Sequence, residues 1–125
     1  MKDCLFCKIA KKEIPSDLIY EDKEIMAFDD INPLAPVHIL VIPKEHIEGL
    51  QTVKDSHQEI LGKLLLTASK IAKQKKLKGY RVFFNCGKIG GQAIFHLHLH
   101  LVGGWKDLPE FVELVRRRLG EGGAI

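Results

Sequence analysis

The chain has 125 residues, of which 46% are hydrophobic and 28% charged, and its 19 basic and 16 acidic residues leave a formal net charge of +3. This length and composition are typical of one soluble globular domain and exclude a disordered tail. The small positive charge is too weak to indicate a nucleic-acid-binding or membrane-surface protein.

The sequence shows no sign of membrane insertion or secretion. No apolar run approaches the ~20 residues that cross a bilayer, and the N-terminus lacks the apolar segment of a signal peptide. Three cysteines, an odd number, argue against a disulfide framework and indicate thiolate chemistry or packing. We therefore expect a cytoplasmic protein with neither membrane nor nucleic-acid partners.

The first part of the chain is predicted to hold a short helix and a hairpin. Asp3 precedes residues 4–10 as an N-cap residue would, and Pro15 requires that helix to end before it. Residues 19–21 and 25–28 are then predicted to pair as two short strands joined by a turn.

The middle of the chain is predicted to hold a central strand and the one long helix. Residues 37–42 are apolar apart from His38, as in a strand that is covered on both faces. From Ser56 onward, apolar residues recur three and four apart down one stripe, which indicates an amphipathic helix. The start of this helix is predicted to carry a capping box between Ser56 and Glu59.

The last third is predicted to hold two further strands and a helix. Residues 81–86 and 93–102 have strand composition, and the glycine-rich loop at 87–91 joins them as an antiparallel pair. Cys86 lies in the first of these strands and is expected to be a small core residue. Apolar residues recur at helical spacing over 111–119, which predicts a short amphipathic helix.

Together these elements predict an α+β domain. It combines a mainly antiparallel five-stranded sheet with one long helix and short helices near both ends of the chain. No internal repeat or linker divides the sequence, so we expect residues 1–125 to form a single domain.

Three histidines alternate with leucines in the run His96-Leu97-His98-Leu99-His100-Leu101. Successive side chains of a strand point to opposite faces, so the imidazoles are predicted to line one face and the leucines to face the core. Neighbouring imidazoles would stand about 6.6 Å apart, too far for one ion to hold all three easily. Histidine has a low strand propensity and titrates near neutrality, so three in register indicate a functional site.

The groups around these histidines favour a phosphate ligand. Imidazole can act as a nucleophile toward phosphorus, as a proton donor and acceptor, and as a metal ligand. The loop at 87–91 can turn backbone N–H groups toward an anion, and Asn85 and Gln92 add neutral donors at its two edges. It is not a Walker P-loop, because no Gly-Lys-Ser/Thr follows a four-residue spacer.

Several motifs together resemble one known family. The His-Leu-His-Leu-His-Leu-Val run, with Gly-Gly-Gln and Asn-Cys-Gly before it, resembles the signature of the histidine triad (HIT) superfamily. Residues 29–38 and 42–47 resemble its nucleotide-binding, Hint-like branch. The resemblance covers residues 4–104 and implies a homodimeric HIT-like fold over that core, followed by a helical extension over 105–125.

The resemblance implies a site for purine nucleotides and catalytic roles for three histidines. His98 is implied to attack the α-phosphorus and form a nucleotidyl-histidine intermediate that water hydrolyses. His100 is implied to hydrogen-bond the phosphate or the leaving group, and His38 to support the proton network. The implied nucleotide contacts are Phe28 and Ile31 for the base, Asp30 for the ribose, and Asn85, Gly91, Gln92, the backbone N–H of Ala93, His98 and His100 around the phosphate.

The implied activity is hydrolysis of nucleoside 5′-phosphoramidates at the α-phosphate, with no metal required for the chemistry. Ala93 stands where many Hint-like proteins carry serine, so one hydroxyl contact is absent and turnover is expected to differ. Relatives often end soon after the triad with residues that reach the partner's active site, whereas this chain continues to Ile125. The leaving-group preference is therefore open.

Cys4 and Cys7 form a CxxC pair, which needs two more ligands to hold zinc. His46 and His96 would complete a Cys2His2 set, and some bacterial HIT proteins and galactose-1-phosphate uridylyltransferase show similar ligands. Such an ion is expected to be structural, since it would pin the N-terminal helix to the sheet and remove His96 from acid–base chemistry. The alternative is that both cysteines are core residues or free thiols.

Three other functions stay open. A dinucleoside polyphosphate hydrolase or a nucleotidyl transferase would share the covalent intermediate and differ in the acceptor. A metal hydrolase would hold zinc with two of the alternating histidines and His38, and would use it to activate water. A non-catalytic nucleotide sensor would bind a nucleoside monophosphate tightly without turnover.

Overall fold

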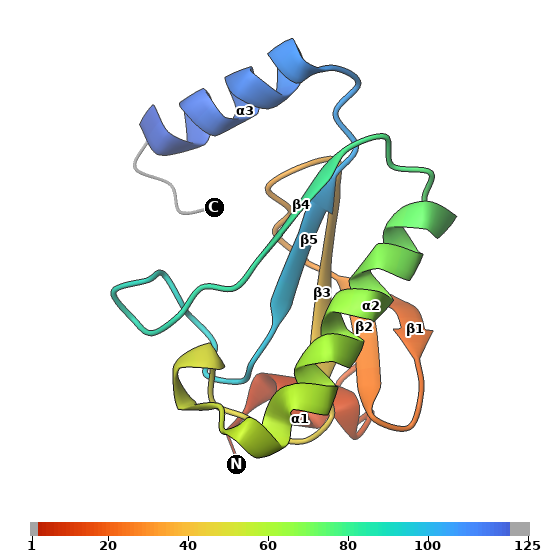
Figure 1. The fold of residues 1–125 in the computed structure, drawn as a ribbon, viewed down its shortest axis with the longest axis vertical. Helices are drawn as coiled ribbons and strands as arrows, with labels where there is room; N and C mark the ends of the chain where they lie inside the picture. The colour runs from red at the N-terminus through yellow and green to blue at the C-terminus, as the bar shows by residue number, and fades with distance from the viewer. Residues whose placement is uncertain (1–2, 121–125) are drawn as a thin grey trace.

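The computed structural model describes residues 3–120, and its strands form one antiparallel sheet in the order β1-β2-β3-β5-β4 (Figure 1). The strands are β1 (Leu18–Glu21), β2 (Ile25–Asp29), β3 (Val37–Pro43), β4 (Tyr80–Phe83) and β5 (Leu99–Gly103). The strand β3 lies at the centre of the sheet, because its apolar side chains are covered on both faces. The predicted hairpin is confirmed as the antiparallel pair β1–β2.

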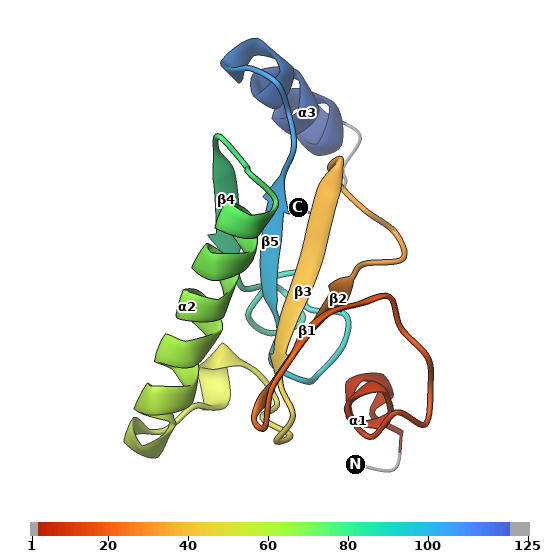
Figure 2. The ribbon, with the colours of Figure 1, turned by 90° about the vertical axis from the view of Figure 1, so that its right-hand side faces the viewer.

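Helices cover both faces of this sheet. The long helix α2 (Gln58–Gln74) lies along one face, and the short helix α1 (Leu5–Ala10) lies against the other face near one end, as Figure 2 shows. A third helix, α3 (Leu108–Gly120), lies beyond the end of the sheet at which β5 ends. The predicted α+β class, with one long helix and shorter ones near both ends, is confirmed.

The face under α2 holds the main hydrophobic core. Its buried members include the leucines at 97, 99 and 101, which pack with the apolar stripe of α2 formed by Ile60, Leu64, Ala68 and Ile71. The alternation of histidine and leucine therefore does what the sequence predicts: the leucines enter the core on one side of the sheet, and the histidines point to the other side.

The opposite face carries a second, smaller cluster. Phe6 and Ile9 of α1 pack there against Phe28, Leu40 and other apolar side chains of β2 and β3. This cluster holds α1 against the same side of the sheet as the histidines. It therefore brings the N-terminal helix, with both of its cysteines, next to a segment about ninety residues later in the chain.

The strand predicted over 93–102 is shorter than expected. β5 begins only at Leu99, and residues 93–98 bend instead of pairing with a neighbouring strand. The Gln92 amide donates to the carbonyl oxygen of Ile94, and Leu97 N–H bonds to the carbonyl of Ile47 in a loop. These contacts engage backbone groups that a regular ladder would need, so the pairing with neighbouring strands begins only after His98.

Two helix caps also differ from the prediction. The N-cap of α1 is Cys4, not Asp3, and its Sγ accepts a hydrogen bond from Cys7 N–H at 3.3 Å. A 3-10 turn over Asp55–His57 precedes α2, so this helix begins at Gln58 and the predicted capping box at its start does not form. His57 Nδ1 instead accepts a hydrogen bond from Lys54 N–H at 3.0 Å.

Two further expectations concern burial and membrane insertion. β4 ends at Phe83, so Cys86 lies in the following loop and is exposed, and its prediction as a core residue is wrong. Within residues 3–120, no helix combines the length and apolar character that a bilayer crossing requires.

The packing of α2 makes a direct prediction about stability. Leu64 is fully buried against the sheet, whereas Leu66 on the same helix is 62% exposed. Leu64→Ala removes buried methyl groups and leaves a cavity, so it should lower the free energy of unfolding by about 2–5 kcal/mol. The matched control Leu66→Ala should stay within about 0.5 kcal/mol of the wild type in the same urea titration. Equal losses in both variants would contradict this packing.

Candidate active site and metal-ligand cluster

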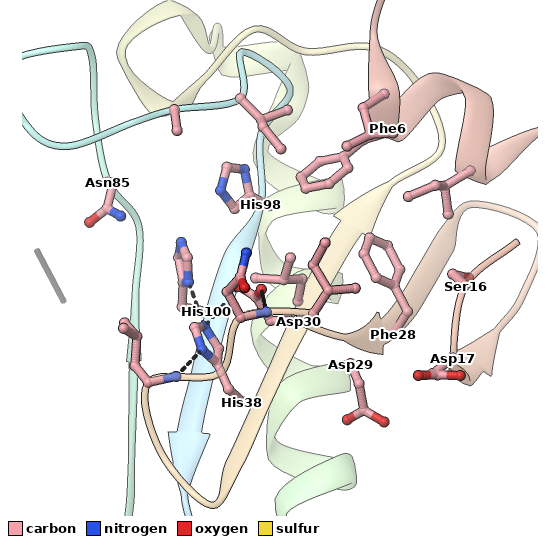
Figure 3. Close-up of a pocket in the computed structure, with 18 of the residues that line it drawn as sticks. Phe6, Ser16, Asp17, Phe28, Asp29, Asp30, His38, Asn85, His98 and His100 are labelled. Atoms are coloured by element: carbon pink, nitrogen blue, oxygen red, sulfur yellow. Dashed lines mark hydrogen bonds and ion pairs between the residues drawn. The ribbon is translucent and has the colours of Figure 1, made fainter. Parts of the chain in front are cut away.

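A cavity of about 370 Å³ lies between α1 and the histidine-bearing face of the sheet. Its apolar end is walled by Leu5, Phe6 and Ile9 of α1 together with Phe28 of β2. Its polar end is lined by Asp30, Asn85, His38, His98 and His100 (Figure 3). An apolar end beside a cluster of polar groups is the usual form of a small-molecule site.

His98 presents one ring nitrogen to this cavity in a defined protonation state. Its Nδ1 lies 2.7 Å from the backbone carbonyl oxygen of His96, and a carbonyl oxygen can only accept a hydrogen bond. Nδ1 therefore carries the proton, and Nε2 of the neutral ring holds a free lone pair. The Phe6 ring packs edge-on against the His98 ring at 5.1 Å and limits its rotation.

His38 and His100 form a relay, which is a chain of hydrogen bonds that all donate in the same direction. Leu34 N–H donates to His38 Nδ1 at 3.0 Å, so the neutral His38 ring carries its proton on Nε2. That nitrogen lies 2.9 Å from His100 Nδ1, which therefore accepts, and the proton of the neutral His100 ring is on Nε2. The backbone N–H of Leu34 thus favours one tautomer in both histidines, and the Asp30 carboxylate, 3.5 Å from His38 Nε2, favours the same one.

The relay ends at an atom without a partner. Among the side chains that the structure describes, His100 Nε2 is the one buried nitrogen or oxygen atom that makes no hydrogen bond. An unpaired buried donor costs free energy, and such groups are concentrated at functional sites. His100 Nε2–H is thus available to a ligand in the cavity that brings its own acceptor, such as a phosphate oxygen.

Burial keeps these three rings neutral at physiological pH. Desolvation, together with the neighbouring His98 and His38, lowers the pKa of His100 to about 3. Desolvation also lowers the pKa values of His38 and His98, although the nearby Asp30 carboxylate opposes this shift in both. A neutral imidazole is the form that can act as a nucleophile.

The loop residues expected near a phosphate divide into two groups. Asn85, Gly91 and Ala93 line the cavity, and so does Ile31, which is 87% exposed at its edge. Gln92 does not line it. The Gln92 amide is buried and accepts from Gly87 N–H and from the Gln51 amide, while it donates to the carbonyls of Glu48 and Ile94.

The side-chain amide of Gln92 is fully engaged within the chain. Both acceptor positions of its oxygen and both protons of its nitrogen have partners. In this structure the side chain therefore stabilises the loop between Gly87 and Gly91, and its predicted nucleotide contact stays a prediction. Both glycines have positive φ, at 75° and 94°, which lets the loop turn back tightly.

A second set of side chains meets at the N-terminal end of α1. Cys4, Cys7, His46 and His96 bring four ligand atoms within 4.8 Å of one another. His96 Nδ1 lies 3.3 Å from Cys4 Sγ and 3.5 Å from Cys7 Sγ, and His46 Nδ1 lies 3.3 Å from Cys7 Sγ. All four residues predicted as metal ligands are therefore brought together, from the N-terminus, the loop after β3 and the segment before β5.

This cluster fits zinc in distance and in donor chemistry. In a tetrahedral site with Zn–S near 2.3 Å and Zn–N near 2.0 Å, sulfur and nitrogen stand about 3.5 Å apart, close to the distances found here. His96 Nε2 donates to the carbonyl oxygen of Pro43 at 2.7 Å, which leaves the Nδ1 lone pair directed at the thiols. Burial and the adjacent Cys4 raise the pKa of the Cys7 thiol, an effect that a bound cation reverses.

A third group of side chains is close enough together to hold a metal ion but lacks a free lone pair on one of its histidines. Asp30, His38 and His100 also bring ligand atoms within 4.8 Å of one another. However, His38 already accepts Leu34 N–H on Nδ1, so its Nε2 holds a proton and has no lone pair for a metal. The arrangement therefore argues against the metal-hydrolase alternative, in which His38 is a zinc ligand.

Some residues of the site were not identified from the sequence. Leu5, Phe6 and Ile9 form the apolar wall of the cavity, and Leu34 fixes the His38 tautomer through its backbone. The spacing of apolar residues in α1 was a signal for a buried helix face, but not for what that face covers. The role of Leu34 has no sequence signal, because any residue except proline supplies a backbone N–H.

Comparison with known proteins places the chain in a family. The family model described as "Scavenger mRNA decapping enzyme C-term binding" matches residues 3–109. Protein HitA of Neisseria gonorrhoeae is 50% identical over 104 residues, which are 82% of this chain and 97% of HitA. A "14 kDa zinc-binding protein" of Zea mays is 52% identical over 103 residues, which are 80% of either chain.

A solved structure agrees with these sequence matches. The HIT family hydrolase from Legionella pneumophila superposes with a TM-score of 0.81 at 49% identity, over 83% of this chain and 95% of that one. The predicted resemblance rested on several motifs over residues 4–104, and the family model matches residues 3–109. The chain therefore belongs to the histidine triad (HIT) superfamily.

Proposed function

We propose that the protein hydrolyses nucleoside 5′-phosphoramidates at the α-phosphorus, with His98 as the nucleophile. The observation that carries this proposal is the free lone pair of His98 Nε2, which faces a cavity that also offers the unpartnered N–H of His100. A nucleophile and a hydrogen-bond donor for the same phosphate are thus present together. The Legionella relative, which is described as a hydrolase, supports hydrolysis as the reaction class.

The shape of the cavity suggests how a purine nucleotide would bind. The apolar end beside Phe6 and Phe28 suits a flat base, and the Asp30 carboxylate lies between this end and the histidines, where it can accept hydrogen bonds from ribose hydroxyls. The phosphate would then meet His98 and His100. Asn85 and the backbone N–H of Ala93 are proposed to bind its oxygens as negative charge builds there.

The reaction is proposed to proceed in two displacements. The lone pair of His98 Nε2 attacks phosphorus, and the bond from phosphorus to the leaving nitrogen breaks with both electrons on nitrogen. His100 Nε2–H donates a hydrogen bond to the phosphate and keeps its proton, and His38 supports the ring through its own hydrogen bond. The leaving nitrogen takes a proton from water, and the resulting hydroxide attacks the same phosphorus as the bond from phosphorus to His98 Nε2 breaks, which releases the nucleoside monophosphate and restores the neutral His98 ring.

Three alternatives give different outcomes from the same site. A dinucleoside polyphosphate hydrolase or a nucleotidyl transferase would use the same His98 intermediate with another leaving group or acceptor. A sensor would bind the nucleotide and stop before cleavage. The buried unpaired donor of His100 favours catalysis, because it is placed to meet charge on the phosphate or leaving group.

The first test is release of AMP from adenosine 5′-phosphoramidate by the purified protein, with and without a strong chelator. We expect AMP release that survives chelation, and a loss of at least about a thousandfold in His98→Ala, because the nucleophile is removed. His57→Ala is the matched control, since the His57 ring contacts Lys54 N–H and the Glu45 carboxylate outside the cavity and its loss should leave full activity.

Other results of this assay would reject the proposal. Loss of activity on chelation in a protein that stays folded would indicate metal catalysis. AMP binding without turnover by the wild type would indicate a sensor or another leaving group, and diadenosine polyphosphates would then distinguish these two.

We also propose that Cys4, Cys7, His46 and His96 hold a structural zinc ion. The sulfur–nitrogen distances and the orientation of His96 support this assignment, and a maize relative is described as a zinc-binding protein. The bound ion would neutralise the two thiolates and fix α1, including Phe6, against the sheet. None of the proposed chemical steps uses it.

Zinc content and stability can be measured on paired cysteine variants. The wild type should contain one zinc per chain, and Cys7→Ser should lose it together with about 4 kcal/mol of stability, which is the contribution of a ligand present at a thousand times its Kd. Cys86→Ser is the control, because this thiol is exposed and lies outside the cluster. Full zinc content in Cys7→Ser would contradict the assignment.

We further propose that two copies of the chain pair through β4. This strand is bonded to β5 on one side only, and it exposes Tyr80 and Val82, which are 41% and 39% accessible. An edge strand that displays apolar side chains favours pairing with another strand. The other edge of the sheet, β1, exposes Leu18.

Sedimentation velocity at micromolar concentration should therefore show a dimer. Val82→Lys places a charge on the proposed contact and should shift the protein toward monomer. Leu18→Lys, on the opposite edge, should leave the dimer intact. A monomeric wild type, or a dimer equally sensitive to both substitutions, would exclude pairing through β4.

A further inference from the structure

The helix α3 touches the loop between β2 and β3. Leu34 and Ala35 of that loop line one side of an apolar cavity of only about 10 Å³, and Trp105, Leu114 and Val115 line the other. A space of this size holds at most about one water molecule, so the two sides are nearly in contact.

Two more contacts fix the position of α3. Trp105 and Phe111 pack with ring centroids 4.6 Å apart, and the Arg81 guanidinium of β4 lies 5.6 Å from the centre of the Phe111 ring. Gly104, which leads into this segment, has φ of 94°, and a Cβ there would fall 2.9 Å from Pro36 Cβ. The chain after β5 therefore turns tightly against the loop before it enters α3 (Figures 1 and 2).

The same loop residue borders the active site. Leu34 lines the large cavity as well as the small one, and its N–H makes the 3.0 Å hydrogen bond to His38. Without that donor, the Nε2 proton of His38 would be held by His100 Nδ1 and by the Asp30 carboxylate 3.5 Å away, so the other neutral tautomer would gain population and His100 would follow through the shared hydrogen bond. His100 Nε2 would then spend time as an acceptor, which repels a phosphate oxygen.

We propose that α3 positions the His38–His100 relay, and that it acts through Leu34. Packing of Leu114 and Trp105 against the loop holds Leu34 N–H in line with His38 and so keeps a proton on His100 Nε2. Leu34 is a positioning residue, because it acts on the substrate only through the two histidines. The catalytic consequence rests on the proposed function, whereas the tautomer of His38 does not.

The test uses the full chain with ¹⁵N-labelled histidine and three variants. Leu114→Ala and Trp105→Leu weaken the contact with the loop, and Leu108→Ala is the control on the same helix, at a side chain that is 69% exposed. In long-range ¹H–¹⁵N spectra, wild type and Leu108→Ala should show His38 with its proton on Nε2. The two contact variants should show a mixture of tautomers while circular dichroism remains that of the folded wild type.

The kinetic arm uses adenosine 5′-phosphoramidate. In the contact variants kcat should fall about three- to tenfold, as for the loss of one hydrogen bond, with a smaller change in KM because charge on the phosphate peaks in the transition state. Leu114→Met, which restores most of the contact, should recover kcat.

Three results would overturn the proposal. They are a His38 ring with its proton on Nδ1 in the wild type, unchanged tautomers in both folded contact variants, or an equal effect of Leu108→Ala. If the wild type releases no AMP, the proposed function fails, and the tautomer measurement still decides whether α3 sets the relay.

Discussion

The burial of Leu97, Leu99 and Leu101 against α2 is the constraint on which the site depends. Hydrophobic packing holds these side chains on one side of the sheet, and the alternation of a chain in extended conformation then sends the intervening histidines to the other side. There α1 meets them and closes the cavity. The same packing that stabilises the domain therefore determines where its reactive groups lie, and no separate interaction is needed to gather them.

Backbone groups determine what each imidazole can do once it is there. The carbonyl of Pro43 takes the proton of His96 and turns its other nitrogen toward the thiols. The carbonyl of His96 takes the proton of His98 and leaves a lone pair in the cavity. The N–H of Leu34, by contrast, donates to His38 Nδ1. The proton of His38 therefore lies on Nε2, which donates to His100 Nδ1, and the proton of His100 lies on Nε2. Three similar side chains thus suit the three roles proposed for them, namely metal ligand, nucleophile and hydrogen-bond donor, because their partners differ.

The differences between prediction and structure have a common physical origin. Gln92 was predicted to offer a neutral donor to phosphate at the edge of the glycine-rich loop, just before a strand over 93–102, yet its amide bonds to four other groups of the chain. The helix cap at Cys4 and the 3-10 turn before α2 likewise depend on partners that meet only in the folded chain. Local patterns identify which residues are polar and available, and competition among distant partners decides which of them remain free for a ligand.

The sequence by itself determined the α+β class, the hairpin, the long helix, the sidedness of the His-Leu run and the four residues of the Cys/His cluster. These follow from periodicity and from motifs, which are properties of short segments. Only the tertiary structure decided the tautomers of His38 and His98, the inward turn of Gln92, and the contact of α3 with Leu34. Each of these depends on the direction of a hydrogen bond or the closeness of a contact between segments far apart in the chain, and residue types do not encode such directions.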